Sequence, residues 1–159
     1  MKRIKKENLP SRHVSLGSIN KVSFGLVKLM NINEAVAEAR TAFHIRGGDF
    51  KSVDRVTTND VRIAIDEMAC NLKKIFVVTN DVKFSSRIFE SIDVDFEISK
   101  LSSKEDFIAI ATSKNVFVSN SSFSFWAAIC AKNSHNSTIY STNSWPYKDF
   151  LETNFPIGL

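Results

Sequence analysis

Hydrophobic residues follow two alternating patterns from residue 42 onward. Short runs rich in β-branched and aromatic residues predict strands at 42–46, 75–79, 94–98, 115–119 and 138–141. Between them, apolar residues recur every three or four positions and predict helices at 58–74, 80–91, 103–113 and 123–132. Strands that alternate with helices in this way are parallel and joined by right-handed crossovers. The pattern therefore predicts an α/β fold with a doubly wound, mainly parallel sheet.

Individual segments refine this prediction. The run 75–79 (IFVVT) is apolar throughout, as in a strand buried on both faces, whereas 94–98 (VDFEI) alternates and predicts an edge strand. Thr58 and Ser103 are the expected helix caps. The stretch 33–40 (NEAVAEAR) predicts a further helix, and the pattern over 15–30 supports no firm assignment.

Composition places the chain among ordinary globular domains. It has 159 residues, 43% of them hydrophobic, with 5 Gly, 3 Pro and 2 Cys. A chain of this length buries about two thirds of its unfolded surface and needs no crosslinks. Cys70 and Cys130 lie in apolar surroundings without a motif spacing, and we expect both to be reduced core residues of a cytoplasmic protein.

The net charge of +4 is concentrated at the N-terminus. Residues 1–30 hold seven basic side chains against the single acid Glu7, a local charge of +6, so the remaining residues sum to −2. We therefore expect no nucleic-acid partner. The polar stretch 7–20 excludes a signal peptide, and no apolar run reaches the ~20 residues of a membrane span. The expected location is the cytoplasm, including a peripheral position at the inner membrane face.

Three of the predicted strands end in unusually polar turns. These turns are 44–49 (HIRGGD), 79–81 (TND) and 119–124 (SNSSFS). In a doubly wound sheet, ligands bind at the carboxyl ends of the strands, near the point where the strand order reverses. Three such turns at that edge predict a binding site.

Two of the turns suggest an anion as the ligand. Residues 119–124 offer several hydroxyl groups and free backbone N–H groups at a helix start, although Ser121 or Ser122 could simply be an N-cap. Arg46, followed by two glycines, could chelate phosphate oxygens; the alternatives are an ion pair with Asp49 and a satisfied core His44.

The sequence lacks the motifs of several common nucleotide-binding and metal-binding sites. The chain contains neither a Walker-type phosphate loop nor a Gly-x-Gly-x-x-Gly motif, and it has no zinc spacing of Cys and His. Asp93 and Asp95 flank Val94 with the spacing of metal-binding carboxylates, but they lie at the edge strand and are assigned to solvent-facing structure.

Taken in order, the three turns resemble the motifs of the bacterial α1,2-fucosyltransferases, glycosyltransferase family 11. The family pattern His-x-Arg-Arg-Gly-Asp-Tyr is similar to 44–50 (HIRGGDF), and Ser-Asp-Asp is similar to 79–81. The most specific match is Ser-Asn-Ser-Thr-Phe-Ser-Trp-Trp-Ala-Ala with 119–128 (SNSSFSFWAA). The resemblance covers about residues 43–146.

The resemblance implies an inverting, metal-independent enzyme without cofactor that uses GDP-fucose and has two facing Rossmann-like halves. The chain is similar only to the C-terminal, donor-binding half. We therefore expect the chain to have two parts. Residues 1–41 would be a basic segment with a remnant of the preceding half, and residues 42–159 would be a GDP-sugar-binding domain. The implied partners are a GDP-sugar donor, a polysaccharide, O-antigen or lipid-linked glycan acceptor, and a missing N-terminal half.

Site residues follow by position in the motifs. Arg46 would bind the donor pyrophosphate and stabilise the leaving group, and Asp54 is the candidate general base. The other implied donor-binding residues are His44, Asp49, Asp81, Asp106, Asn120, Ser121, Ser122 and Phe123. One departure removes a cation, because Gly47 stands where the family motif has its second Arg. The alternative function is a non-catalytic remnant that binds GDP-sugar weakly or not at all.

Overall fold

The computed structural model describes residues 16–31, 38–48, 55–68 and 74–142. Five parallel strands form one sheet in the order β3-β2-β1-β4-β5. Their bounds are β1 Glu38–Ile45, β2 Ile75–Thr79, β3 Phe96–Ile98, β4 Ser113–Val118 and β5 Thr138–Ser141. This arrangement confirms the predicted doubly wound sheet, with β3 at one edge.

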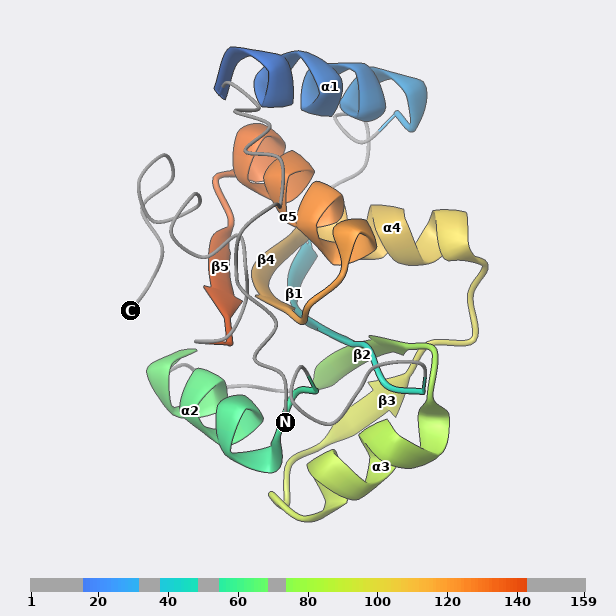
Figure 1. The fold of residues 1–159 in the computed structure, drawn as a ribbon, viewed down its shortest axis with the longest axis vertical. Helices are drawn as coiled ribbons and strands as arrows, with labels where there is room; N and C mark the ends of the chain where they lie inside the picture. The colour runs from blue at the N-terminus through green and yellow to red at the C-terminus, as the bar shows by residue number, and fades with distance from the viewer. Residues whose placement is uncertain (1–15, 32–37, 49–54, 69–73, 143–159) are drawn as a thin grey trace, which may run out of the picture.

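Helices cover both faces of the sheet (Figure 1). On one face lie α2 (Thr58–Met68) and α3 (Val82–Glu90), and on the other lie α4 (Ser103–Ala111) and α5 (Ser122–His135). The helix α1 (Leu16–Leu29) packs on the outside of α5 and forms a further layer. Among the described helices, none is long and apolar enough to cross a membrane.

The strands build two cores because their side chains alternate between the faces of the sheet. Phe43 of β1 stacks on its register partner Phe117 of β4, with ring centroids 4.9 Å apart, and meets Phe89 of α3 edge-on at 5.6 Å. The neighbouring Ala42 points to the other core, beneath α4 and α5. Cys130 lies fully buried there, as predicted; Cys70 lies outside the described residues.

Local hydrogen bonds fix where the helices begin and end. Asp81 caps α3 by accepting the Phe84 N–H at 3.0 Å, and Ser102 forms a capping box with Glu105 at the start of α4. At its far end α5 stops at Asn136, whose φ of 51° is left-handed.

Several sequence predictions need correction. Thr58 is the first residue of α2 and not its cap, because the hydroxyl of Thr57 accepts the Asp60 N–H at 3.1 Å. Residues 38–40 belong to β1 and are not helical; 33–37 lie outside the described residues. The cap of α4 is Ser102, not Ser103, and the helix ends at Ala111, because Ser113 already pairs with Glu38 as the first residue of β4. The edge strand β3 begins at 96 instead of 94, and α5 runs over 122–135 instead of 123–132. As assigned, Asp93 and Asp95 are exposed.

Candidate functional site

The candidate site lies where the chain reverses its direction across the sheet. From β1 the chain runs through β2 to β3, then crosses back to β4 on the other side of β1. The adjacent strands β1 and β4 therefore flank the switch point, and the crevice outside their carboxyl ends is the usual ligand site of such sheets. His44 and Arg46 stand at the end of β1, and Ser119 follows β4.

Ser119 links the two strand ends. Its Oγ accepts the Arg46 backbone N–H at 3.0 Å and is joined by a hydrogen bond of 2.9 Å to Nδ1 of His44. Only 1% of Ser119 is exposed, so this contact is shielded from water. Sequence reasoning noticed Ser119 only as part of a polar turn. Its role as the clamp between β1 and β4 depends on strands that are 75 residues apart in sequence.

His44 is neutral at pH 7. Burial and, to a smaller extent, the positive charge of Arg46 together lower the pKa of its imidazole from 6.5 to about 4. The ring packs against Phe123 with centroids 5.5 Å apart. Ser119 is its hydrogen-bonding partner within the described part of the chain. His44 is thus a buried histidine with Nδ1 hydrogen-bonded, as the core alternative expects.

The turn that follows β2 supports the backbone after Arg46. The Gly47 N–H donates to Oδ1 of Asn80 at 2.9 Å, and the Gly48 N–H donates to Oδ2 of Asp81 at 3.1 Å. The other oxygen of Asp81 caps α3. Asp81, predicted as a donor-binding residue, therefore has both carboxylate oxygens engaged with backbone N–H groups, and its observed contacts shape the turn.

Gly47 is a steric requirement of this turn. A Cβ at this position would lie 2.7 Å from the Cβ of Asp81 and 3.0 Å from the ring of Phe84. Gly48 adopts a left-handed φ of 56°, which also favours glycine. The two glycines thus let the β1 turn sit directly on the start of α3.

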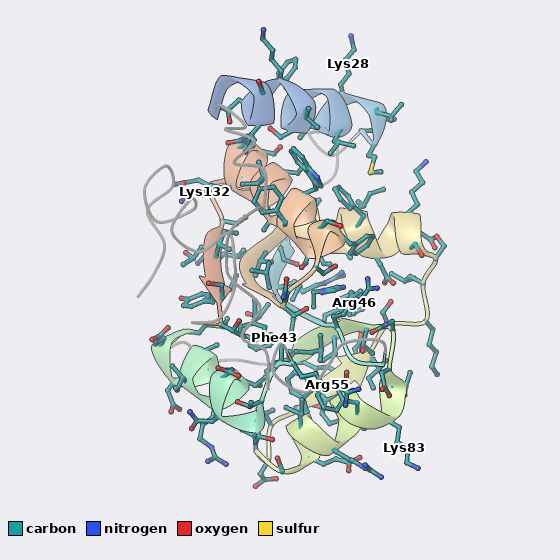
Figure 2. The ribbon with its side chains drawn as sticks, in the orientation of Figure 1. Lys28, Phe43, Arg46, Arg55, Lys83 and Lys132 are labelled. Carbon is teal, nitrogen blue, oxygen red and sulfur yellow. The ribbon has the colours of Figure 1, made fainter. Side chains whose placement is uncertain are left out.

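Arg55 braces the same turn from the outside. Its Nη2 donates to the Gly48 carbonyl at 3.1 Å, and its guanidinium lies over the Phe84 ring, 5.5 Å from the centroid. Figure 2 shows Arg46 and Arg55 in the region of these turns. No sequence motif indicated Arg55, because its contact reaches back to a turn seven residues earlier.

Helix α5 begins directly after β4, on the other side of the switch point from Arg46. Ser121 is the N-cap and accepts the Phe123 N–H at 3.2 Å, so the capping alternative holds for this residue. Ser122 is exposed and Asn120 is partly exposed. The first turn of a 14-residue helix presents backbone N–H groups and a positive dipole end, which together favour an anion.

An aromatic contact places the start of α4, which carries Asp106, beside the start of α5. Phe107, the neighbour of Asp106, meets Phe123 edge-on, with centroids 5.6 Å apart. Asp106 accepts a hydrogen bond from the Ser99 hydroxyl, and its partial burial raises the pKa of the carboxyl. The structure thus brings together His44, Arg46 and Phe123. The predicted Asp106 lies on α4 and bonds Ser99, which follows the edge strand β3. Asp49 and Asp54 lie outside the described residues.

Comparison with known proteins assigns this arrangement to a family. The sequence profile named Glycosyl transferase family 11 matches residues 18–157. The chain belongs to glycosyl transferase family 11. It is the fucosyltransferase family whose motifs resemble the three polar turns of this chain. The search of curated proteins found no match.

The fold of this family 11 domain is also found in a solved structure. The structure of POFUT1 in complex with GDP aligns with a TM-score of 0.52 at 9% identity, over 79% of this chain and 46% of POFUT1. POFUT1 in complex with GDP-fucose aligns with a TM-score of 0.45 at 9% identity, over 78% of this chain and 45% of POFUT1. The family 11 domain described here thus spans about half the length of these chains.

Proposed function

We propose that this family 11 domain binds GDP-fucose in the crevice between β1 and β4. The observation that carries the proposal is the convergence of Arg46 and the N-terminus of α5 on one switch point, locked together by Ser119. A guanidinium and a helix start are the two groups that proteins use most readily for phosphate oxygens. We assign the pyrophosphate to Arg46 and Ser122, and the guanine and ribose to the side of His44, Asp106 and Phe123.

The same groups can stabilise GDP as the leaving group of the transfer reaction. When the bond from fucose to the β-phosphate breaks, negative charge develops on the phosphate oxygens. Fixed donors aimed at that charge stabilise it without reorganising. The backbone N–H of Arg46 donates to Oγ of Ser119, which holds this residue in place. The Ser121 cap fixes the start of α5 and with it the helix dipole. We therefore propose that these groups carry the charge without a metal ion or cofactor.

Calorimetric titration in EDTA tests donor binding. We expect GDP and GDP-fucose to bind, and GMP to bind more weakly because it lacks the second phosphate. Arg46→Ala should weaken GDP binding by roughly 1.5–3 kcal/mol, the size of a charged hydrogen-bonded contact. Arg46→Lys should restore little, because an ammonium cannot reproduce the fork of a guanidinium.

A matched control separates the site from net charge. Arg62 is exposed on α2, on the opposite face of the sheet from α5. Arg62→Ala removes the same charge from the chain and should leave GDP affinity unchanged. GMP binding as tightly as GDP, or an equal loss in Arg46→Ala and Arg62→Ala, would contradict the phosphate assignment.

For the complete reaction we propose inverting transfer of fucose, with α1,2 linkage, to a polysaccharide, O-antigen or lipid-linked glycan in the cytoplasm. The free, buried Cys130 is compatible with that reducing compartment. We further propose that a second half supplies the acceptor groove, since the chain spans 46% of POFUT1. Asp54 is the proposed base that takes the acceptor proton.

A radiolabelled GDP-fucose assay tests the complete reaction. The chain alone should give no transfer to sugar and at most slow donor hydrolysis, and a supplied N-terminal half should restore transfer. Robust transfer by the chain alone would refute the need for a second half. Full activity of Asp54→Asn in the complemented enzyme would exclude Asp54 as the base. The alternative, a non-catalytic remnant, predicts no activity even after complementation.

A further inference from the structure

The outward side of α1 combines apolar and basic side chains. We define the outer α1 face as Lys21, Val22, Phe24, Lys28 and Leu29. Phe24 and Leu29 are 70% and 76% exposed, and Val22 is 47% exposed. At 100° per residue these five positions share one half of the helix, with Phe24 at its border toward α5. Helix α1 is the outermost layer of the described structure (Figure 1).

The opposite side of α1 is held firmly on α5. Ile19 and Val27 are buried at 4% exposure, and Asn133 of α5 donates from Nδ2 to Oγ of Ser23 at 2.8 Å and to Oδ1 of Asn20 at 3.4 Å. Because these contacts fix the rotation of α1, the outer α1 face cannot turn into the core.

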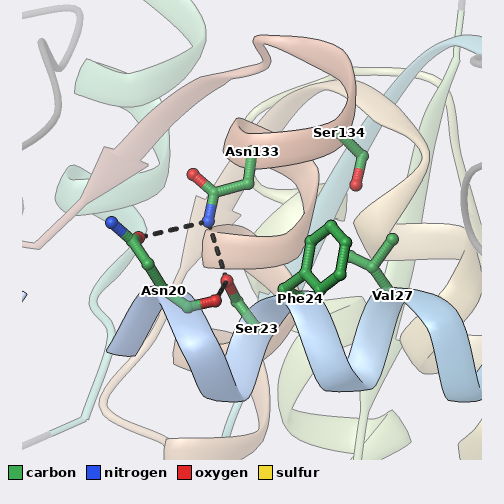
Figure 3. A pocket seen from close by; sticks show the side chains of 6 residues that line it. All are labelled: Asn20, Ser23, Phe24, Val27, Asn133 and Ser134. Atoms are coloured by element: carbon green, nitrogen blue, oxygen red, sulfur yellow. Dashed lines mark hydrogen bonds between the residues drawn. The ribbon is translucent and has the colours of Figure 1, made fainter. Parts of the chain in front are cut away.

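A groove of about 310 Å³ runs beside these contacts, between α1 and the C-terminal part of α5. Figure 3 shows Phe24 at this groove with Val27 and Ser134. The groove lies at the end of α5 that is remote from its Ser121 cap. A partner bound at the outer α1 face would therefore leave the crevice between β1 and β4 open.

Charge indicates the nature of that partner. Helix α1 contains no acidic residue, and the first 30 residues carry seven basic side chains against one acidic. Figure 2 shows Lys28 directed away from the body of the protein. Lysine is depleted at the centres of protein interfaces. At the surface of an anionic bilayer, by contrast, ammonium groups meet the headgroups while neighbouring apolar side chains enter the interface.

We propose that the outer α1 face binds the surface of an anionic lipid bilayer. Lys21 and Lys28 contact the anionic headgroups, and Val22, Phe24 and Leu29 enter the interfacial region. The inference does not depend on which donor the crevice takes. It would hold the domain on the membrane through the helix layer most remote from α2 and α3.

Flotation with vesicles tests the proposal on the full chain. We expect binding to phosphatidylcholine vesicles that contain 30% phosphatidylglycerol, little binding to pure phosphatidylcholine, and release in 1 M NaCl, where the screening length is about 3 Å. A surface lysine contributes about fivefold to such binding. Lys21→Glu/Lys28→Glu should therefore weaken it by about 30-fold or more.

The matched charge control is Lys83→Glu/Arg87→Glu. Both residues are exposed on α3, on the far side of the sheet, and the control changes the net charge by the same four units. It should bind anionic vesicles within a few fold of the unaltered chain. An equal loss in both double variants, or unchanged binding of Lys21→Glu/Lys28→Glu, would overturn the proposal.

A second pair of variants tests the apolar contribution. Phe24→Ser/Leu29→Ser should weaken vesicle binding at least tenfold, whereas Ile63→Ser, at a 44% exposed position of α2, should not. Circular dichroism verifies that both fold. If the unaltered chain ignores anionic vesicles, or if light scattering finds a dimer that Phe24→Ser/Leu29→Ser converts to monomer without vesicle affinity, the face is not a lipid-binding surface.

Discussion

The neutral state of His44 predicts a specific dependence of stability on pH. The pKa of a histidine is 6.5 in an unfolded chain, and burial lowers that of His44 to about 4 in the folded protein. Between these values the unfolded chain binds a proton that the folded chain does not, so acid favours unfolding. The contribution of His44 to stability is therefore complete above pH 6.5 and is lost as the pH falls from 6.5 toward 4.

The size of this effect follows from the two pKa values. Each unit of difference corresponds to about 1.4 kcal/mol, which gives a total of about 3 kcal/mol at low pH and about 2 kcal/mol between pH 7 and pH 5. The group is only 6% exposed, so solvent screening removes little of it. A loss of about 2 kcal/mol is a large part of the stability of a domain of this size.

Urea unfolding at pH 7, 6 and 5, followed by tryptophan fluorescence, measures the free energy of unfolding. The unaltered chain should lose about 2 kcal/mol more over this range than His44→Asn, whose amide places a polar atom near the position of Nδ1 but cannot be protonated. Equal slopes for the unaltered chain and His44→Asn would refute the assignment of a buried, neutral imidazole.

Three further substitutions test the turns and the core. Ser119→Ala leaves the Arg46 N–H without its acceptor and should lower the free energy of unfolding by about 2 kcal/mol, with weaker GDP binding in calorimetry. Gly47→Arg restores the second arginine of the family motif but brings a Cβ against Asp81; we expect a loss of roughly 1–3 kcal/mol in urea unfolding and no gain in GDP affinity. Phe125→Ala, at a buried position of α5, should cost roughly 3–5 kcal/mol, and an unchanged unfolding midpoint would contradict its place in the core.

Local patterns in the sequence were sufficient for most of the elements. The strands at 75–79 and 138–141 were predicted with the bounds that the structure gives. Short runs rich in β-branched and aromatic residues, bounded by polar residues, are typical of strands. The polar turns after β1, β2 and β4 could be assigned to one edge of the sheet, because parallel strands end on the same side.

Residues 38–40 show where local preference fails. The sequence NEAVAEAR favours a helix, yet Glu38 pairs with Ser113 and Thr41 with Asn115 and Ile75 in the central strand of the sheet. Pairing with β4 begins at Glu38 and pairing with β2 begins at Thr41. The backbone hydrogen bonds of these two ladders outweigh helix propensity, which contributes less than about 1 kcal/mol per residue.

The chemistry of the candidate site was decided by tertiary structure. The sequence identified His44 and Arg46 as candidates, but the neutral imidazole follows from burial beneath Phe123 and from the nearby guanidinium. The Ser119 contacts exist only because β4 lies beside β1, across 75 residues of chain. Likewise, only the packing of the β1 turn on Asp81 explains why position 47 holds glycine. Pattern and propensity act over a few residues, whereas burial, clamping and close approach depend on which distant segments become neighbours.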